Sequence, residues 1–540
     1  MSYTSFKFIA FVAVTAAVYF LFPVKKYQWT VLLAASYVFY LMAGYKYAAF
    51  IVFTTISVYY LSLAIDKIAQ RAAEELKAHK QDWDREQKKE YKAQIDKKKR
   101  RVMALAVVVN IGILAFLKYS NFFIGSLSSL TGLFGLDWSA PTLKLFLPLG
   151  ISFYTFQSVG YVVDVYRGKF PAERNLAKLA LFVSFFPQII QGPISFYDKL
   201  AYQLYEPHRV DFTRMKHGAE LVLWGFFKKL VIADRALIAI NCVSDNYTAY
   251  SGTAVGFAIL LYALQLYTDF SGGIDVSRGV AQILGIDMVQ NFKRPYFSIS
   301  INDYWRRWHI TLGAWMKEYV FYPLALSKRF TNVSKKIRAT RFGASRAGAH
   351  VAKVLPTSFA SLIVFLLVGI WHGADWRYVA FGLWNGGIIM LSTLLEPLFE
   401  LTNVKLRINV KALWFRCFRI LRTFLIVLVG YVFDVAWSLK DALVMFYMML
   451  TKQSLGMFRH EFLELGLNKL DYALLAICTV FLFGVSLVQE QHSDSSIRAM
   501  LDEKPFILRY LFLLVGIVTI LIFGMYVSGL GGTEFVYMQF

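Results

Sequence analysis

One histidine stands at the end of a strongly apolar segment. The run that begins at Ile363 and ends in Trp371 leads directly into His372 and Gly373. Hydrocarbon solvates an imidazole badly, so we expect His372 to face the protein interior or a water-filled cavity. The ring titrates near neutrality, which suits a general base at a buried reaction centre. A structural histidine that bonds to a neighbouring helix is the alternative.

A second group of polar and aromatic residues lies within residues 300–312. Two tryptophans, two arginines and a histidine follow one another: Trp305, Arg306, Arg307, Trp308 and His309. Aromatic rings and basic side chains both find partners at the lipid headgroup boundary, so an interfacial anchor helix is one interpretation. As a site, the arginines would bind the phosphates of an anionic acyl donor while His309 points toward the reaction centre.

Polar residues also interrupt two other apolar segments. Residues 147–157 place Tyr154 and Gln157 at bilayer depth, where both need partners. Residues 186–193 contain two prolines, a glycine and two amides, Gln188 among them. Such a break at membrane depth is tolerated only against protein or water. Tight helix packing is one explanation, and the wall of a polar cavity, which the density of polar types favours, is the other.

Carboxylates and thiols give no metal-binding pattern. Asp269 and Asp275 lie six residues apart beside Ser271 and paired glycines, which is a poor ligand set for a cation. We expect these carboxylates to cap helices or to pair with the arginines that follow. The three cysteines show no CxxC spacing, so neither a zinc site nor a disulfide framework is indicated.

The composition places these residues in an all-α, polytopic membrane protein. Of 540 residues, 57% are hydrophobic and 17% aromatic, which is far more apolar surface than one soluble core needs. We expect about eleven transmembrane helices, with re-entrant and interfacial helices between them, in a single integral-membrane domain over residues 1–540. The other elements then serve to position the histidines.

The charge pattern predicts the orientation in the membrane. The formal net charge of +23 is concentrated in segments between apolar spans, as the positive-inside rule requires, and this gives little weight to nucleic-acid binding. We therefore expect the charged segment 66–101 and the basic loop 327–354 in the cytoplasm. The aromatic tail, residues 528–540, should lie outside.

Five strings, in this order and spacing, resemble the membrane-bound O-acyltransferase superfamily. They are LPLGISFYTFQ from Leu147, FPQIIQGPI from Phe186, YTDFSGGID from Tyr267, WRRWHITL from Trp305 and WHG from Trp371. More narrowly, the chain is similar to the bacterial branch that contains the alginate O-acetylation membrane protein and the D-alanyl transfer protein of teichoic acid synthesis. Gln191 and Gly273 depart from the common pattern, which leaves the donor and the acceptor open.

The resemblance implies a fold that surrounds a tunnel, with a cytoplasmic donor at one end and an acceptor at the other. His372 matches the catalytic histidine of the family, and His309 matches its second characteristic histidine. We expect the following residues to bind substrate or donor: Arg306, Arg307, Trp305, Trp308, Trp371, Tyr154, Gln157, Gln188 and Asp269. No metal and no tightly bound cofactor is expected.

The resemblance also implies the partners. The donor would be acetyl-CoA or an acyl group on the phosphopantetheine arm of a carrier protein. The acceptor would be a cell-envelope or exported polysaccharide, reached with an external SGNH-hydrolase-like acyltransferase. The protein would contact membrane lipids, not nucleic acid, and would lie in the inner or plasma membrane of a bacterial cell.

The C-terminal tail carries a second chemical hypothesis. Its ending, FVYMQF, resembles the aromatic C-terminal motif of the same bacterial branch. A phenol with a pKa of ~10 is a poor nucleophile unaided, but beside a histidine base Tyr537 could accept the acyl group and pass it on. The alternative is that the aromatic tail only packs at the interface.

Other functions stay open at the level of sequence. Within the family, the alternatives are D-alanyl transfer to teichoic acid and acylation of a lipid or a protein. A secondary transporter would often have two related halves, yet neither WRRWH nor WHG is repeated. A non-catalytic scaffold gives no reason for the two histidines.

Overall fold

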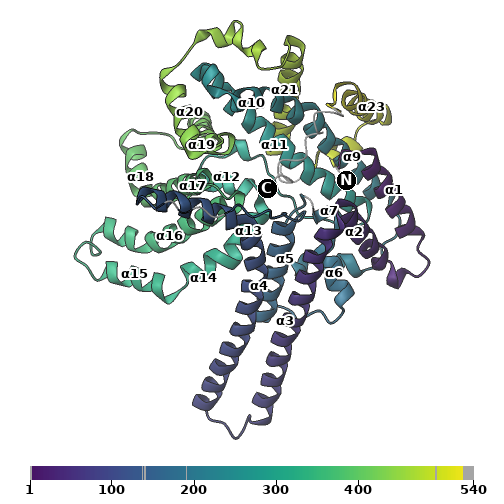
Figure 1. Ribbon diagram of the computed structural model, residues 1–540, viewed down its shortest axis with the longest axis vertical. Coiled ribbons are helices and arrows are strands. Elements are labelled where there is room, and N and C mark those ends of the chain that lie inside the picture. The colour runs from purple at the N-terminus through teal and green to yellow at the C-terminus, as the bar shows by residue number, and fades with distance from the viewer. Residues whose placement is uncertain (1–2, 137, 139–140, 190, 493–495, 527–540) are drawn as a thin grey trace. The chain divides into compact units, whose positions relative to one another are not determined.

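The computed structural model describes residues 3–136, 138, 141–189, 191–492 and 496–526. These residues form helices and connecting loops with no strand among them, so the expected all-α class is confirmed (Figure 1). The chain divides into two compact units, of which the first comprises Met1–Ala219 and Ser277–Val289 and the second Glu220–Val276 and Gln290–Phe540. The single domain over residues 1–540 stays a prediction.

Eight helices lie wholly in the first unit. They are α1 (Phe6–Leu21), α2 (Trp29–Ala43), α3 (Tyr45–Ala78), α4 (Arg85–Leu133), α5 (Ile151–Arg167), α6 (Leu176–Ser184), α7 (Phe186–Ile189) and α8 (Tyr197–Tyr205). The short α7 follows α6 after one residue and ends at Ile189, so the predicted break of the apolar segment near residues 186–193 is present. Phe186 packs edge-on against Phe11, with ring centroids 5.2 Å apart, which fixes this break to α1.

The charged segment 66–101 is a helical hairpin. It comprises the end of α3, a short turn and the first part of α4, and Figure 1 shows the two helices side by side over a long distance. Asp84 begins α4 in a capping box with Gln87, whose backbone nitrogen donates to the Asp84 carboxylate at 2.7 Å. Most of these side chains are exposed. The prediction of a solvated helix is therefore confirmed.

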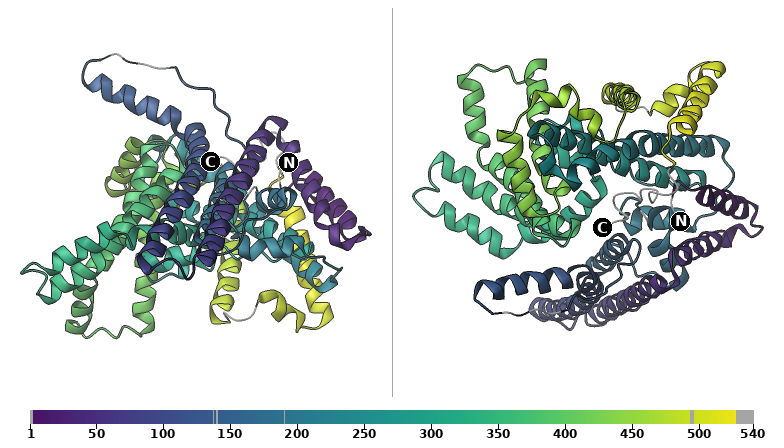
Figure 2. Two further views of the ribbon diagram at one scale, coloured as in Figure 1. Left: turned by 90° about the horizontal axis from the view of Figure 1, so that it is seen from below. Right: turned by 45° about the horizontal axis from the view of Figure 1, so that its top comes forward.

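The stretch after α4 is irregular, as Figure 2 shows, and part of it folds back along that helix. The Asn121 side chain exchanges two hydrogen bonds with the backbone of Leu143, at 2.9 and 3.0 Å. The helix itself continues to Leu133.

The second unit contains thirteen α-helices wholly within its described residues. They are α10 (Asp234–Asp245), α12 (Ile301–Arg307), α13 (Ile310–Met316), α14 (Tyr322–Ala325), α15 (Lys328–Arg338), α16 (Arg346–His372), α17 (Trp376–Leu394), α18 (Glu396–Lys405), α19 (Leu413–Val435), α20 (Leu439–Thr451), α21 (Lys469–Gln491), α22 (Ile497–Asp502) and α23 (Phe506–Phe523). Two more, α9 (Phe212–Phe226) and α11 (Gly252–Ile283), contribute residues to both units.

Glycines allow α16 and α17 to pack closely. A Cβ atom at Gly382 would lie only 2.5 Å from the carbonyl oxygen of Phe365, so no larger residue fits there without moving a helix. Gly386 faces Leu362 and Phe365 one turn further along. Small residues at such a crossing bring two backbones together and maximise van der Waals contact. This contact holds the end of α16, which carries His372, against α17.

The basic segment 327–354 is not a loop. It contains α15 and the first turns of α16, joined by residues 339–345. Ser327 and Ser345 cap the two helices by accepting bonds from the backbone nitrogens of Phe330 and Gly348. These serines are local signals for a helix start, and a count of charges does not detect them. The cations of the segment are mostly exposed.

Six described helices are long and apolar enough to cross a membrane: α3, α4, α11, α16, α21 and α23. The number is seven if the bent pair α17 and α18, which meet at 57°, forms one span. The polytopic membrane class is confirmed, whereas the number of about eleven spans stays a prediction. The difference arises because several apolar segments are short; α1, for example, has 16 residues.

Candidate active site

His372 is the last residue of α16 and is 9% exposed. Its ring lies against the rings of Trp371 and Phe381, with centroids 5.2 and 5.3 Å away. The next residue must be small, because a Cβ atom at Gly373 would overlap the ring of Tyr378. The chain can therefore turn sharply into α17 only after a glycine, and this turn fixes the imidazole at the helix end.

His309 links α12 to α13 with an unusual backbone conformation. Its φ of 46° and ψ of 52° are left-handed, which costs free energy for any residue with a Cβ atom. The side chain of Asn291 supports this turn, since its Oδ1 accepts bonds from the backbone nitrogen and the hydroxyl of Thr311, both at 2.9 Å. The Ile310 nitrogen donates to the Asn291 carbonyl at 3.0 Å.

The same asparagine indicates the tautomer of His309. Asn291 Nδ2 lies 3.2 Å and Oδ1 3.4 Å from His309 Nδ1; because Oδ1 already accepts two bonds from Thr311, we assign the contact with the ring to Nδ2. An amide nitrogen donates, so Nδ1 is the acceptor and Nε2 carries the proton of the neutral ring. Burial, together with repulsion by His372, lowers the pKa of His309 to about 3. His309 is thus a neutral hydrogen-bond donor.

The two histidines share a neighbour. His309 lies edge-on to Trp371, with ring centroids 5.9 Å apart, and Trp371 also contacts His372. The prediction that both histidines serve one centre agrees with this arrangement. His309 is 1% exposed and packs against Phe270 at 4.9 Å, which places the pair in a dry environment.

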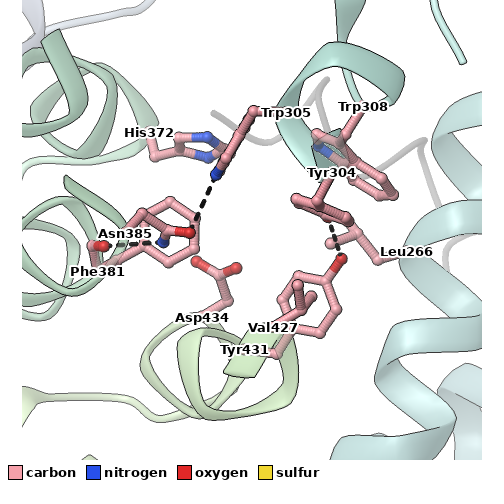
Figure 3. Close-up of a pocket in the computed structure, with 10 residues that line it drawn as sticks. All are labelled: Leu266, Tyr304, Trp305, Trp308, His372, Phe381, Asn385, Val427, Tyr431 and Asp434. Atoms are coloured by element: carbon pink, nitrogen blue, oxygen red, sulfur yellow. Dashed lines mark hydrogen bonds between the residues drawn. The ribbon is translucent and has the colours of Figure 1, made fainter. Parts of the chain in front are cut away.

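A pocket opens beside His372 and encloses about 310 Å³ of space, part of which is open at its mouth. Its lining is mainly aromatic, with an amide and a carboxylate: Leu266, Tyr304, Trp305, Trp308, His372, Phe381, Asn385, Val427, Tyr431 and Asp434. Figure 3 shows these side chains around one opening.

Hydrogen bonds hold most polar groups of this pocket. Trp305 Nε1 donates to Asn385 Oδ1 at 3.1 Å, and the Asn385 amide donates to the Phe381 carbonyl at 3.0 Å. The hydroxyls of Tyr304 and Tyr431 lie 2.7 Å apart, and Tyr431 also contacts Tyr296 at 3.1 Å. The aromatic walls are therefore rigid, because both their rings and their polar ends are fixed.

The surroundings of the tryptophans in residues 300–312 differ from those of an interfacial anchor. Trp308 is 3% exposed and packs against Tyr304 and Phe292, with centroids 5.6 and 5.0 Å apart. Trp305 lines the pocket. The expectation of a lipid-headgroup anchor is wrong for Trp308, since aromatic partners distant in sequence bury it. The role of both rings in substrate binding stays a prediction.

The two predicted phosphate-binding arginines have different surroundings. Arg307 bonds to Asp303 at 3.1 Å and to Glu490 at 3.1 Å, and Glu490 also binds Arg294 at 2.6 Å. Arg307 is therefore held by carboxylates from α12 and α21. Arg306 is exposed and forms no ion pair with another described residue. Of the two, Arg306 is the better candidate for an anionic donor.

Tyr154, Gln157 and Gln188 belong to the first unit. Gln157 donates to the Phe182 carbonyl at 2.8 Å and accepts a bond from Gln188. All three side chains are buried, and Gln188 Oε1 and both polar atoms of Gln191 have no hydrogen-bond partner in the part of the chain that the structure describes. Buried polar atoms of this kind are usually satisfied by water, which favours the polar-cavity interpretation.

Asp269 and Asp275 pair with lysines. Both lie inside α11, where Asp269 binds the Lys229 ammonium and Asp275 binds Lys228 at 2.7 Å. The lysines are 1% and 3% exposed within a π-helical segment, Phe227–Ala233. The expectation named arginines as partners and missed these two lysines, because pairing offsets the desolvation of charges that hydropathy alone keeps at a surface. Asp269 is therefore occupied by a structural partner.

Three polar residues of the site were not predicted: Asn291, Asn385 and Asp434. Two of them had a usable signal, since Asn385 and Asp434 lie inside segments that we expected to be apolar spans, where a polar residue is by default a functional candidate. Asn291 lies in a loop and carries no such signal. Tyr537 lies outside the described residues. No group of three or more potential metal ligands occurs among the residues that the structure describes.

Comparison with known proteins identifies the family. The sequence profile of the membrane-bound O-acyltransferase family, MBOAT, matches residues 169–342 and 349–432, which include His309 and His372. A probable alginate O-acetylase of Azotobacter vinelandii is 31% identical over 446 residues, or 81% of this chain and 76% of the relative. This chain belongs to the membrane-bound O-acyltransferase family. It is therefore a multi-pass membrane enzyme of the acyltransferase class, and a transporter is disfavoured.

Other relatives in the family are named for different activities. A peptidoglycan O-acetyltransferase of Helicobacter pylori is 32% identical over 316 residues, covering 53% of this chain and 54% of the relative. A teichoic acid D-alanyltransferase of Bacillus subtilis is 28% identical over 253 residues, covering 45% of this chain and 58% of the relative. The family membership thus leaves the acyl group and the acceptor to be inferred.

Proposed function

We propose that this protein transfers an acetyl group from a cytoplasmic thioester to a hydroxyl of a cell-envelope or exported polysaccharide, in the inner membrane of a bacterium. The observation that carries the proposal is that His309 and His372 both pack against Trp371, and that His372 lines an aromatic pocket. The acetylating relatives support the acetyl group and the polysaccharide.

In the proposed reaction the two histidines have different tasks. His372 accepts the proton of the acceptor hydroxyl as its oxygen attacks the thioester carbonyl. His309 donates from Nε2 to the carbonyl oxygen, where negative charge develops. The C–S bond then breaks, and the leaving thiolate takes the proton from the His372 imidazolium. The ring returns to its neutral form, and the products are an ester and a free thiol.

The donor would enter from the cytoplasmic side. Acetyl-CoA and the phosphopantetheine arm of a carrier protein both carry phosphate, which exposed cations attract. Arg306 and the cations of α15 supply such charge. An external SGNH-hydrolase-like acyltransferase would complete the transfer where the polymer itself does not enter the pocket, and Tyr537 would then relay the acyl group.

A vesicle experiment tests the proposed function. The full chain is reconstituted with radiolabelled acetyl-CoA inside, and label on an external acceptor is measured. We expect label outside as an ester with the natural protein, and a loss of at least about 100-fold with His372→Ala, since general-base catalysis contributes that much or more. His350→Ala on the same helix serves as control. Intact acetyl-CoA outside would contradict the proposal.

Two further arms separate the open alternatives. Replacing acetyl-CoA by a D-alanyl thioester tests the D-alanyltransferase activity for which the Bacillus subtilis relative is named. Faster transfer of D-alanyl than of acetyl would contradict the acetyl proposal. Mass spectrometry of the C-terminal peptide tests the relay. An acyl adduct on Tyr537 and a loss of polymer acetylation in Tyr537→Phe are expected, whereas full acetylation by Tyr537→Phe would end the relay hypothesis.

A further inference from the structure

Asp434 is a pocket residue that the proposed proton transfer does not use. It is the next-to-last residue of α19 and lines the same pocket as His372, Trp305 and Asn385. Figure 3 shows its carboxylate projecting into the space that the labelled side chains surround. Its Oδ1 atom is buried and accepts no hydrogen bond from any residue that the structure describes.

The neighbouring cation does not neutralise this carboxylate. Arg377 at the start of α17 donates from Nη1 to the backbone carbonyls of Asp434, at 3.3 Å, and of Ala436. Its Nη2 donates to the Tyr378 hydroxyl at 3.3 Å. The guanidinium thus holds the end of α19 in place by backbone bonds. The carboxylate keeps its full capacity to accept a hydrogen bond, and leaving that capacity unused in a buried place costs free energy.

The other polar groups of the pocket leave Asp434 as the strongest free acceptor. The Trp305 and Asn385 side chains bond to each other, and Tyr304 bonds to Tyr431. An O–H group that enters the pocket therefore finds this carboxyl oxygen available as a hydrogen-bond acceptor. The aromatic walls match the apolar C–H face of a sugar ring, while its hydroxyls require polar partners at the edge.

We propose that Asp434 binds a hydroxyl of the acceptor other than the one that is acylated, so that the site selects sugars and similar polyols over simple alcohols. This inference rests on the proposed function, because the acceptor must occupy the pocket beside His372. The contact is a hydrogen bond from the substrate O–H to the carboxylate and involves no covalent step. Asp434 is thus a specificity residue.

The test compares acceptors that differ by one hydroxyl. The purified full chain is given acetyl-CoA with a methyl pyranoside or with its deoxy analogues, each lacking one hydroxyl. We expect kcat/KM to fall about 10- to 100-fold for at least one analogue, as for loss of a hydrogen bond to a charged group. Asp434→Asn should raise KM for the parent sugar and remove most of this difference. Asp434→Glu should retain part of it.

The control is Glu400→Gln, which makes the same change at an exposed carboxylate of α18 and should behave as the natural protein. Equal use of the parent and all deoxy analogues by the natural protein would overturn the role of Asp434 while leaving the proposed function intact. An equal loss on every acceptor in Asp434→Asn would indicate only a structural role. If the natural protein prefers a D-alanyl donor and Asp434→Asn abolishes that preference, the carboxylate binds the ammonium group of the donor instead. No acetylation of any sugar by the natural protein would overturn the role of Asp434, and the vesicle experiment would then decide between a relay through Tyr537 and failure of the proposed function.

Discussion

At the scale of the residue, His309 and His372 have different surroundings and therefore different roles. His309 is fixed by Asn291 on one nitrogen and presents a proton on the other. His372 ends a helix at the edge of a pocket, where a base can meet an incoming hydroxyl. The division into donor and base follows from the surroundings of each ring, since the residue type is the same.

The pKa of His309 gives a prediction about pH. Because burial and then repulsion by His372 lower this pKa to about 3, His309 stays neutral from pH 5 to 9 and does not titrate in the pH–rate profile. We expect His309→Asn to lower kcat by about 100- to 1,000-fold, as for loss of an oxyanion donor, while the acid limb of the profile keeps its midpoint. Asparagine tolerates the left-handed backbone of this position, so the turn should survive.

The measurement is kcat at saturating acetyl-CoA over that pH range. His350→Asn, on α16 and away from the pocket, is the matched histidine control. Displacement of the acid limb in His309→Asn would mean that His309 itself titrates, and the assignment of a neutral donor would then be wrong.

At the scale of the element, the contact between α16 and α17 determines where His372 lies. We expect Gly382→Ala to push α16 away, because its Cβ atom would lie 2.5 Å from the Phe365 carbonyl oxygen. A shift of about 1 Å at the reacting group lowers the rate by about 100-fold, and overpacking costs about 1–3 kcal/mol of stability.

Gly387→Ala is the matched control, since a Cβ atom at that position of α17 meets nothing within 4 Å. It should leave activity unchanged and stabilise the helix by up to about 1 kcal/mol. Acyl transfer and thermal unfolding in detergent measure both effects. Equal activity of the two variants would show that the helix contact does not position the imidazole.

The buried pair of Lys229 and Asp269 gives a second prediction at this scale. Both side chains are at most 1% exposed, so removing one leaves an uncompensated charge. Lys229 also binds Asp234 at 2.9 Å. We expect Lys229→Met to destabilise the protein by about 3–5 kcal/mol, whereas Lys229→Met with Asp269→Leu should recover part of this loss, since only Asp234 then stays without its cation. Exposed Lys405→Met should have little effect. Thermal unfolding measures all three, and a double variant no more stable than the single one would contradict the pairing.

At the scale of the whole molecule, charge predicts which face lies inside the cell. The segments 66–101 and 327–354 are rich in cations and should both be cytoplasmic. In a variant without the three natural cysteines, Lys89→Cys and Thr340→Cys place one thiol at an exposed position of each segment. We expect a membrane-impermeant maleimide to label both in inside-out vesicles and neither in intact spheroplasts. Labelling of one of them in spheroplasts would reverse the predicted orientation for that segment.

The class, the family and the two histidines could be predicted from the sequence. Long apolar segments identify membrane helices by themselves, and short strings such as WRRWH and WHG carry the family pattern locally. The helix caps at Asp84 and Ser345 are equally local, and they begin helices where the residue type predicts. Each of these features depends on neighbours within a few positions.

Only the tertiary structure decided which polar groups are free to act. The Trp305–Asn385 bond joins residues 80 positions apart, and the Lys229–Asp269 pair joins residues 40 apart. Hydropathy treats each polar residue alone, so it named no partner for the lysines and left Asp434 unnoticed within an apolar segment. Whether a buried charge is satisfied or available depends on the partner that folding brings to it, and distance along the chain does not reveal that partner.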